Sequence, residues 1–227
     1  MINQYFVQKE EQGHIARRAF CICLDLYTPF TLVLFTISRI SKQRKISGSG
    51  HELGKSLKIR NSSTITFVLS ATMAALVTVS TYVVQIPVPA TSGYINIGDI
   101  MVFTSALVFG PLVGGIAGGL GSSLADMLGG YWAFVPITFV VKGIEGLISG
   151  FLSNGRNVNR DALAVLAGGI VMISGYFLAE TYLLGYGAAA FLEVPGNIIQ
   201  VTVGGLVGIP ASYAIRKLVH SFNIGRS

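Results

Sequence analysis

The side chains in this sequence that could do chemistry are polar groups set inside or beside long apolar stretches. The candidates for holding a small polar solute are Asn96, Asp99, Asp126, Lys142, Glu145, Asn197 and Gln200. An ionisable group inside a membrane costs about 3 kcal/mol on insertion scales, so each one is a functional hypothesis. Carboxylates, carboxamides and one ammonium group can bind a ligand through hydrogen bonds and charge.

The spacing of Lys142 and Glu145 leaves two interpretations open. Residues three apart share a helix face and partly neutralise each other, which favours a structural ion pair. Alternatively, Lys142 faces Asp126 or an anionic part of a ligand, and Glu145 tunes it. Asp99 and Glu193 are ambiguous too, because a carboxylate is also favourable as a cap at a helix N-terminus.

Glu180 has no cation nearby in the sequence, so we expect it to have a buried partner or a ligand. Aromatic side chains fall in or beside the same connecting segments: Tyr94, Tyr131, Trp132, Phe134, Tyr182 and Tyr186. They are typical of interfacial anchors, or else of a stacking pocket for a flat heterocycle.

Several kinds of catalytic site have no material here. The two cysteines, Cys21 and Cys23, are one residue apart, and the three histidines are scattered, so we expect no metal site. A G-x-x-x-x-G-K-[ST] phosphate loop is missing, as is a nucleophile paired with a base. The sequence therefore predicts a non-enzyme without a cofactor, which cannot drive a pump by hydrolysing ATP itself.

The polar groups must be positioned by membrane helices. The chain has 227 residues, 52% of them hydrophobic and 11% charged, whereas soluble domains carry about 25% charged residues. A helix needs about 20 apolar residues to cross a bilayer. The windows that approach this length are 66–86, 97–109, 112–128, 136–152, 162–184 and 194–218. We therefore predict an all-α membrane protein built as a six-transmembrane-helix bundle.

The distribution of charge predicts the orientation of this bundle. Residues 1–60 hold ten Lys/Arg against four Asp/Glu, 61–215 three against six, and 216–227 three against none. The loops 87–96, 129–135 and 185–193 contain no Lys or Arg. By the positive-inside rule both ends of the bundle are cytoplasmic, and the polar candidates gather toward the outer side. Basic charge confined to the ends also argues against nucleic acid as a partner.

The chain divides into three predicted segments. Residues 1–62 form a basic N-terminal extension whose apolar segment 20–40 is either an interfacial helix or a seventh span, or else reflects a start site assigned too far upstream. Residues 63–218 form the membrane domain, and residues 219–227 form a cytoplasmic tail.

Small residues at four-residue spacing predict close helix contacts. Gly114 and Gly118, with Gly115 and Gly119, lie in the third window, where packing inside the bundle explains them. In the first window Ala71 and Ala75 form a similar pair, which favours either packing inside the bundle or a groove for another subunit.

Several motifs in order resemble one family. They are GYINIGD at 93–99, FGPLVGG at 109–115, GSSLAD at 121–126, KGIEG at 142–146 and PGNIIQ at 195–200. Together they resemble the substrate-binding S components of energy-coupling factor (ECF) vitamin transporters, in the riboflavin- or hydroxymethylpyrimidine-type branch. The resemblance covers roughly residues 63–218, and the N-terminal extension is not part of the family's pattern.

The resemblance implies a subunit in the cell membrane that captures a vitamin or its precursor from outside, in a pocket roofed by the first extracellular loop. Riboflavin, a pyrimidine or a pyridoxine-like compound would fit. It implies ATP-driven import with a transmembrane T component, docked through Ala71 and Ala75, and two cytoplasmic ATPases. The alternatives from other classes are an autonomous facilitator or channel and a structural membrane subunit.

Overall fold

The computed structural model describes residues 54–88, 91, 93–155 and 157–224, and its side chains from 64 to 218. Lys58–Ser227 forms one compact unit, to which the description below is confined. Most of the predicted N-terminal extension, including the apolar segment 20–40, lies outside the described residues. The predicted tail begins as helix, since the last helix continues to Ile224.

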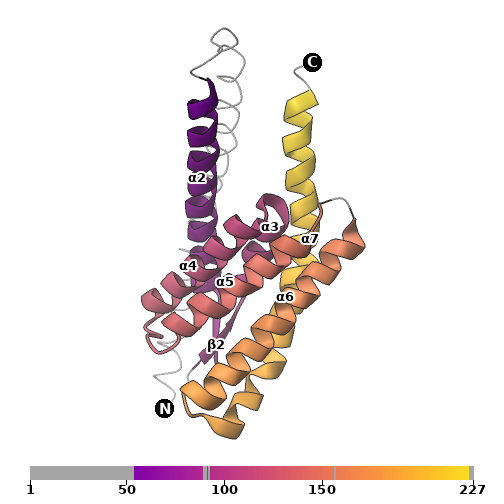
Figure 1. Cartoon of the computed structure of the whole chain (residues 1–227). Helices are drawn as coiled ribbons and strands as arrows, with labels where there is room; N and C mark the ends of the chain where they lie inside the picture. Colours follow the sequence, from indigo (N-terminus) through magenta and orange to yellow (C-terminus); the bar gives the residue numbers. More distant parts are fainter. Residues whose placement is uncertain (1–53, 89–90, 92, 156, 225–227) are drawn as a thin grey trace, which may run out of the picture. The chain divides into compact units, whose positions relative to one another are not determined.

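The described elements are mainly helices. In chain order they are α2 (Gly54–Val83), β1 (Gln85–Val88), β2 (Gly93–Asn96), α3 (Asp99–Phe109), α4 (Pro111–Gly129), α5 (Val135–Leu152), α6 (Val158–Leu178), the π-helical turn η1 (Ala179–Leu183), the 3₁₀ helix η2 (Gly187–Leu192) and α7 (Val194–Ile224). In Figure 1, α4, α5 and α6 run side by side, and β2 lies at one end of them. The strands β1 and β2 pair antiparallel as a hairpin, so we call this the hairpin end.

The fold is mostly helical, as predicted, and the segment expected to be a polar turn contains a short hairpin. The first window was expected to stay helical to Ile86, but α2 ends at Val83 and Gln85–Val88 pairs antiparallel with Gly93–Asn96. Pro87 and Pro89 explain why the helix stops, because proline removes a backbone donor and restricts the residue before it. A two-stranded ribbon is marginal by itself, so its stability must come from packing on the helices.

Five described helical segments, rather than the six predicted, are long and apolar enough to cross a membrane. They are Thr64–Val83, Pro111–Gly129, Val135–Leu152, Val158–Leu183 and Gly187–Leu218. The exception is α3, whose 11 residues extend only about 16 Å, against roughly 30 Å of hydrocarbon. The five long segments keep apolar side chains exposed, among them Phe67 at 74% and Leu206 at 72% exposure, as a lipid-facing surface requires.

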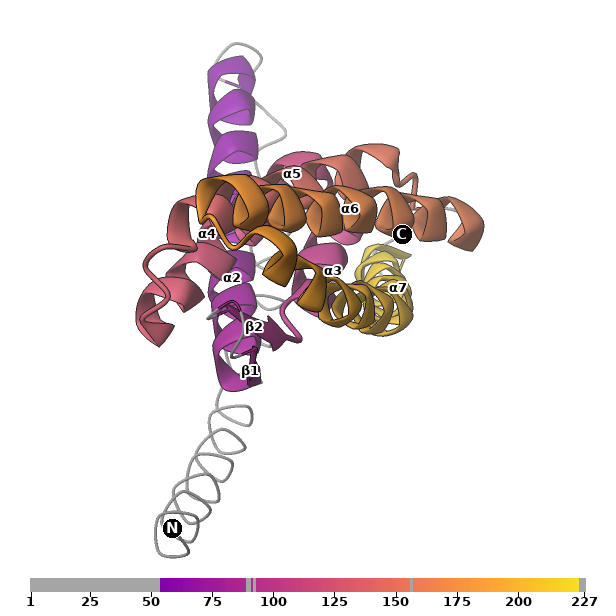
Figure 2. The same cartoon turned by 90° about the horizontal axis from the view of Figure 1, so that it is seen from below.

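The short helix α3 lies at the centre of the unit, where it packs against α4, α5 and α7 (Figure 2). Its residues 102–107 are all buried. Val102 joins the apolar cluster of Met73, Val77, Val113 and Ala117, which links α3 to α2 and α4. Protein rather than lipid therefore surrounds α3, which makes both its shortness and an acidic residue at its start tolerable.

Glycines bring α4 close to its neighbours, as the small-residue spacing predicted. A Cβ on Gly114 would lie 2.6 Å from the Cα of Ala106 in α3 and 2.9 Å from the carbonyl oxygen of Gly146 in α5. A Cβ on Gly118 would lie 2.5 Å from the carbonyl oxygen of Lys142. These backbone approaches fix the position of α5, and with it the side chains that α5 carries toward the centre.

Gly146→Ala should destabilise the protein by about 1–3 kcal/mol, because its Cβ would overlap the carbonyl oxygen of Gly114, a backbone atom that cannot move aside. Gly143→Ala is the matched control on the same helix, since its Cβ would meet nothing closer than 3.7 Å. Thermal unfolding in detergent should show a lower midpoint for the first variant alone. Equal midpoints for both variants would contradict this packing.

The end of α3 away from the hairpin is fixed by Arg216 of α7. Its guanidinium donates to the carbonyl oxygen of Leu107 and, over 2.8 Å, to Oδ2 of Asp161 in α6. Ser153, just after α5, donates to Oδ1 of the same carboxylate over 2.6 Å. Four helices are thus joined at this end, while the polar groups considered next lie toward the hairpin end.

Candidate functional site

A buried ion triad lies under the hairpin. Lys142 of α5 donates to Oδ1 of Asp99 at the start of α3, and its Nζ lies 3.0 Å from Oε2 of Glu145. All three side chains are at most 2% exposed. The predicted pairing of Lys142 with Glu145 is present, and Asp99 joins it from 43 residues away. Asp99 therefore directs Oδ1 of its carboxylate at Lys142, and the N-cap position of α3 is taken by Gly98.

Gln200 of α7 connects this triad to the hairpin. Its Nε2 donates to Oδ1 of Asp99 over 3.3 Å, and its Oε1 accepts the backbone N–H of Asn96 over 2.9 Å. The Asn96 side chain accepts the N–H of Gly98 over 2.8 Å, just before α3. Three of the predicted site residues thus lie together and hold strand β2 against the helices.

Tyr94 fixes the hairpin on its other side. Its hydroxyl donates to Oδ1 of Asp126 in α4 over 2.5 Å, and its ring lies 4.5 Å from that of Tyr131, centre to centre. Burial raises the pKa of Tyr94 well above its usual range, and the neighbouring Asp126 carboxylate raises it further. Tyr94 therefore stays protonated and keeps donating to Asp126 at any physiological pH.

The turn of the hairpin rests on Glu193, just before α7. Thr91 donates to Oε1 of Glu193, and a Cβ on Gly93 would overlap the same oxygen. Glu193 was considered as a helix cap, but here its carboxylate receives the hairpin. Glu180 lies buried beside the carboxyl group of Glu193. The buried neighbour expected for Glu180 is therefore another carboxyl group.

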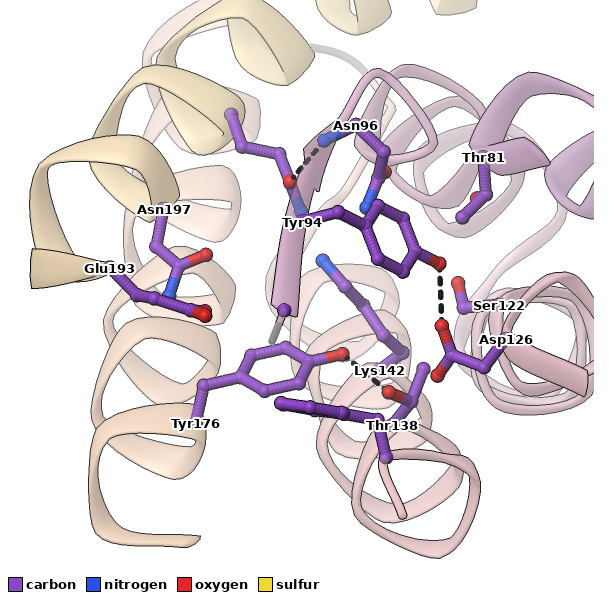
Figure 3. Close-up of a pocket in the computed structure, with 13 residues that line it drawn as sticks. Thr81, Tyr94, Asn96, Ser122, Asp126, Thr138, Lys142, Tyr176, Glu193 and Asn197 are labelled. Carbon is purple, nitrogen blue, oxygen red and sulfur yellow. Dashed lines mark hydrogen bonds between the residues drawn. The ribbon is translucent and has the colours of Figure 1, made fainter. Parts of the chain in front are cut away.

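These elements enclose a small cavity (Figure 3). Its lining residues are Thr81, Gly93, Tyr94, Asn96, Ser122, Asp126, Phe134, Thr138, Lys142, Tyr176, Glu193, Asn197 and Gln200. Its free volume is about 30 Å³, which is room for roughly one or two water molecules. The labelled side chains of Tyr94, Lys142, Tyr176 and Asn197 point inward from four different elements. The lining side chains are therefore already assembled around a space too small for a larger solute.

Five of the seven predicted binding residues line the cavity, and Asp99 and Glu145 lie behind it, bound to Lys142. The sequence-based selection missed four hydroxyl residues of the wall, which resemble the many other hydroxyl residues of apolar helices: Thr81, Ser122, Thr138 and Tyr176. Of the aromatic candidates, Tyr94 and Phe134 line the cavity, whereas Trp132 and Tyr182 are 65% and 77% exposed. The aromatic candidates thus divide between the cavity wall and the exposed surface.

Gly93→Ala should loosen the hairpin, because the added methyl group overlaps the Glu193 carboxylate that holds the turn. We expect amide hydrogen exchange across residues 85–96 to accelerate about tenfold, which corresponds to about 1.4 kcal/mol of lost closure. Ile86→Ala, on the exposed face of β1, is the control and should leave the exchange unchanged. Slow exchange in both variants would mean that Glu193 does not hold the hairpin.

Comparisons with known proteins identify relatives of the segment that builds this cavity. Residues 61–217 match the model of the family described as ECF-type riboflavin transporter, S component. Over 139 residues the chain is 30% identical to the thiamine precursor transporter HmpT of Lactococcus lactis subsp. cremoris (strain MG1363), covering 59% of this chain and 79% of HmpT. Over 144 residues it is 45% identical to a Pyrococcus woesei protein described as an uncharacterized protein in the gap 3' region, covering 63% of this chain and 96% of that protein.

The matched residues include the helices and the hairpin that build the cavity. The members of this family are substrate-binding subunits of transporters. The resemblance seen in the sequence motifs is therefore confirmed. The chain has several long apolar helices and a buried polar site, and it matches a family of transport proteins. Together these findings indicate a multi-pass membrane protein. The chain belongs to the ECF-type riboflavin transporter S component family.

Proposed function

We propose that this chain captures a vitamin or vitamin precursor from outside the cell, for ATP-driven import by partner subunits. The observation that carries the proposal is the small polar cavity, where aromatic, charged and other polar side chains from six elements converge beneath a hairpin. The substrates named for the matched family and for HmpT favour riboflavin or a thiamine precursor, and a pyridoxine-like compound has a similar size.

In this proposal the hairpin end faces outward and both ends of the bundle are cytoplasmic. The basic residues of the loops and tails support this orientation through the positive-inside rule. The hairpin then acts as a gate. A volume of about 30 Å³ cannot hold a heterocycle, so binding requires the hairpin to move and the side chains beneath it to separate.

ATP-driven import requires partner subunits that hydrolyse ATP, because no phosphate-binding loop is found in this sequence. We propose a transmembrane T component and two cytoplasmic ATPases, with the T component docking on α2. Ala71 and Ala75 support this site, since both are exposed on one face of α2, whereas Ala74 between them is 6% exposed and faces the core.

The test is ligand capture by the purified full chain. Native mass spectrometry should reveal a retained small molecule, and riboflavin, hydroxymethylpyrimidine, thiamine or pyridoxine should raise the unfolding temperature. If no molecule is retained and no compound raises that temperature, a structural role is favoured instead. Uptake into liposomes by this chain alone, without an ATPase, would favour a facilitator.

A further inference from the structure

The last turn of α3 leaves a backbone acceptor that its own helix does not satisfy. In a continuing helix the carbonyl oxygen of Leu107 would accept the N–H of residue 111, but residue 111 is a proline. The chain also turns at Gly110, whose φ is +90° and whose N–H donates to Ala106 instead. Arg216 of α7 supplies the missing donor to Leu107. A guanidinium at a helix C-terminus also meets the negative end of the helix dipole.

Arg216 is itself held in place. Its side chain is 18% exposed, and one of its nitrogens lies 2.8 Å from the fully buried carboxylate of Asp161 in α6. The centre of the Tyr213 ring lies 5.4 Å from Cζ of Arg216, and a Cβ on Gly155 would lie 3.4 Å from the same atom. Contacts from α6, from α7 and from the segment between α5 and α6 thus restrict where the guanidinium can go. The end of α3 is therefore tied to a fixed point.

The helix α3 is also held along its length by α7. A Cβ on Gly204 would lie 2.8 Å from Cβ of Asp99, and a Cβ on Gly208 would lie 3.2 Å from the carbonyl oxygen of Ile100. Gln200 of α7 donates to Asp99, the first residue of α3. A regular helix of 11 residues moves as one body, so a displacement at its last turn also displaces its first residue.

The first residue of α3 belongs to the polar site. Oδ1 of Asp99 accepts from both Lys142 and Gln200. Two residues separate α3 from strand β2, whose last residue, Asn96, donates its N–H to Gln200 and accepts the N–H of Gly98. A shift of α3 would therefore change the ion triad and the closure of the hairpin together.

From these contacts we infer that Arg216 is a positioning residue for the cavity, although it is not among the residues that line it. By completing the far end of α3, Arg216 keeps Asp99 within reach of Lys142 and Gln200, and so keeps β2 closed over the cavity. The consequence for solute affinity rests on the proposed function, whereas the consequence for the hairpin does not.

Hydrogen exchange in the purified full chain, without any added solute, tests this inference. Arg216→Met should accelerate amide exchange in residues 93–98 about tenfold, because the hairpin opens more often when α3 is free to shift. Amides that exchange through local opening do not respond to a change in global stability alone. A lower unfolding temperature with unchanged exchange in residues 93–98 would therefore overturn the inference and leave Arg216 a purely structural role.

Two further variants sharpen the test. Arg216→Lys keeps the positive charge but lacks the fork that reaches a carbonyl and a carboxylate together, so we expect an acceleration of about threefold. This variant decides the question alone if Arg216→Met does not fold. Ser153→Ala is the matched control, since it removes a hydrogen bond to the same Asp161 carboxylate and leaves the bond from Arg216 to Leu107 in place. Faster exchange of residues 93–98 in this control would contradict the assigned role of Arg216.

Solute affinity gives a second measurement. For whichever of riboflavin, hydroxymethylpyrimidine, thiamine or pyridoxine raises the unfolding temperature of the wild type, calorimetry should show about tenfold weaker binding to Arg216→Met and unchanged binding to Ser153→Ala. Unchanged affinity in Arg216→Met would overturn its effect on the solute, even if the hairpin opens more often. If no compound binds the wild type, the proposed function fails, while the exchange of residues 93–98 still decides whether Arg216 positions the hairpin.

Discussion

Lys142→Met is expected to destabilise the folded protein by about 3–5 kcal/mol, because it leaves the carboxylates of Asp99 and Glu145 buried without their cation. These two side chains are almost inaccessible to solvent, so water cannot replace the lost partner. The methionine keeps a similar length and apolar stem, so the loss reports charge rather than volume. Unfolding in detergent, followed by temperature or denaturant, measures the change.

The double variant Lys142→Met with Asp99→Asn separates the two roles that the sequence left open for Lys142. Removing both charges of the closest pair should recover a large part of the stability. If Lys142 also contacts the solute from its place in the cavity wall, ligand affinity stays low in the double variant. Recovery of both the stability and the ligand affinity would mean that Lys142 only holds the helices together. A single Lys142→Met variant as stable as the wild type would contradict the buried triad itself.

The spans could be predicted from the sequence because lipid imposes length and apolarity on each helix separately. The short helix α3 shows where this reasoning stops. Its window was included as a sixth span, but the helix is short. A short helix is tolerated here because other helices surround it, and the sequence does not show which helices do so. The hairpin was missed because its strands have only four residues each, and β1 contains a proline, so they give almost no periodic signal.

The site was predictable in part for a similar reason. An ionisable or amide side chain in an apolar window is conspicuous, because a polar group is costly inside a membrane. This reasoning alone identified Asp126, Asn197 and Gln200, which line the cavity. The partner of each one was not predictable. Asp99 and Lys142 are 43 residues apart, and Asn96 and Gln200 are 104 apart, so their pairing is set by helix packing rather than by spacing. The glycines of α4, which allow that packing, gave the only advance indication of it.

Changing both Ala71 and Ala75 to Leu is expected to reduce co-purification with a T component at least tenfold, while ligand affinity stays within about a factor of two. Alanines four residues apart let another helix approach closely, and each leucine overfills that contact at a cost of about 1–3 kcal/mol. Both positions are exposed in the folded unit, so the added side chains would not have to enter its core. Pull-down of tagged partners, with calorimetry of the ligand, measures the two effects.

Exposed alanines elsewhere make this test specific. Ala162 of α6 and Ala214 of α7 are also exposed, and their replacement by leucine adds the same apolar volume to the surface. The control variant therefore carries Ala162→Leu and Ala214→Leu. If α2 carries the docking face, this control assembles normally with the T component, because lipid adapts to a larger side chain while a packed helix does not. A parallel fall in assembly and ligand affinity in the α2 variant would instead mean that the helix, through Met73 and Val77, holds the apolar core. Loss of assembly alone would separate the surface that binds the T component from the cavity that binds the solute.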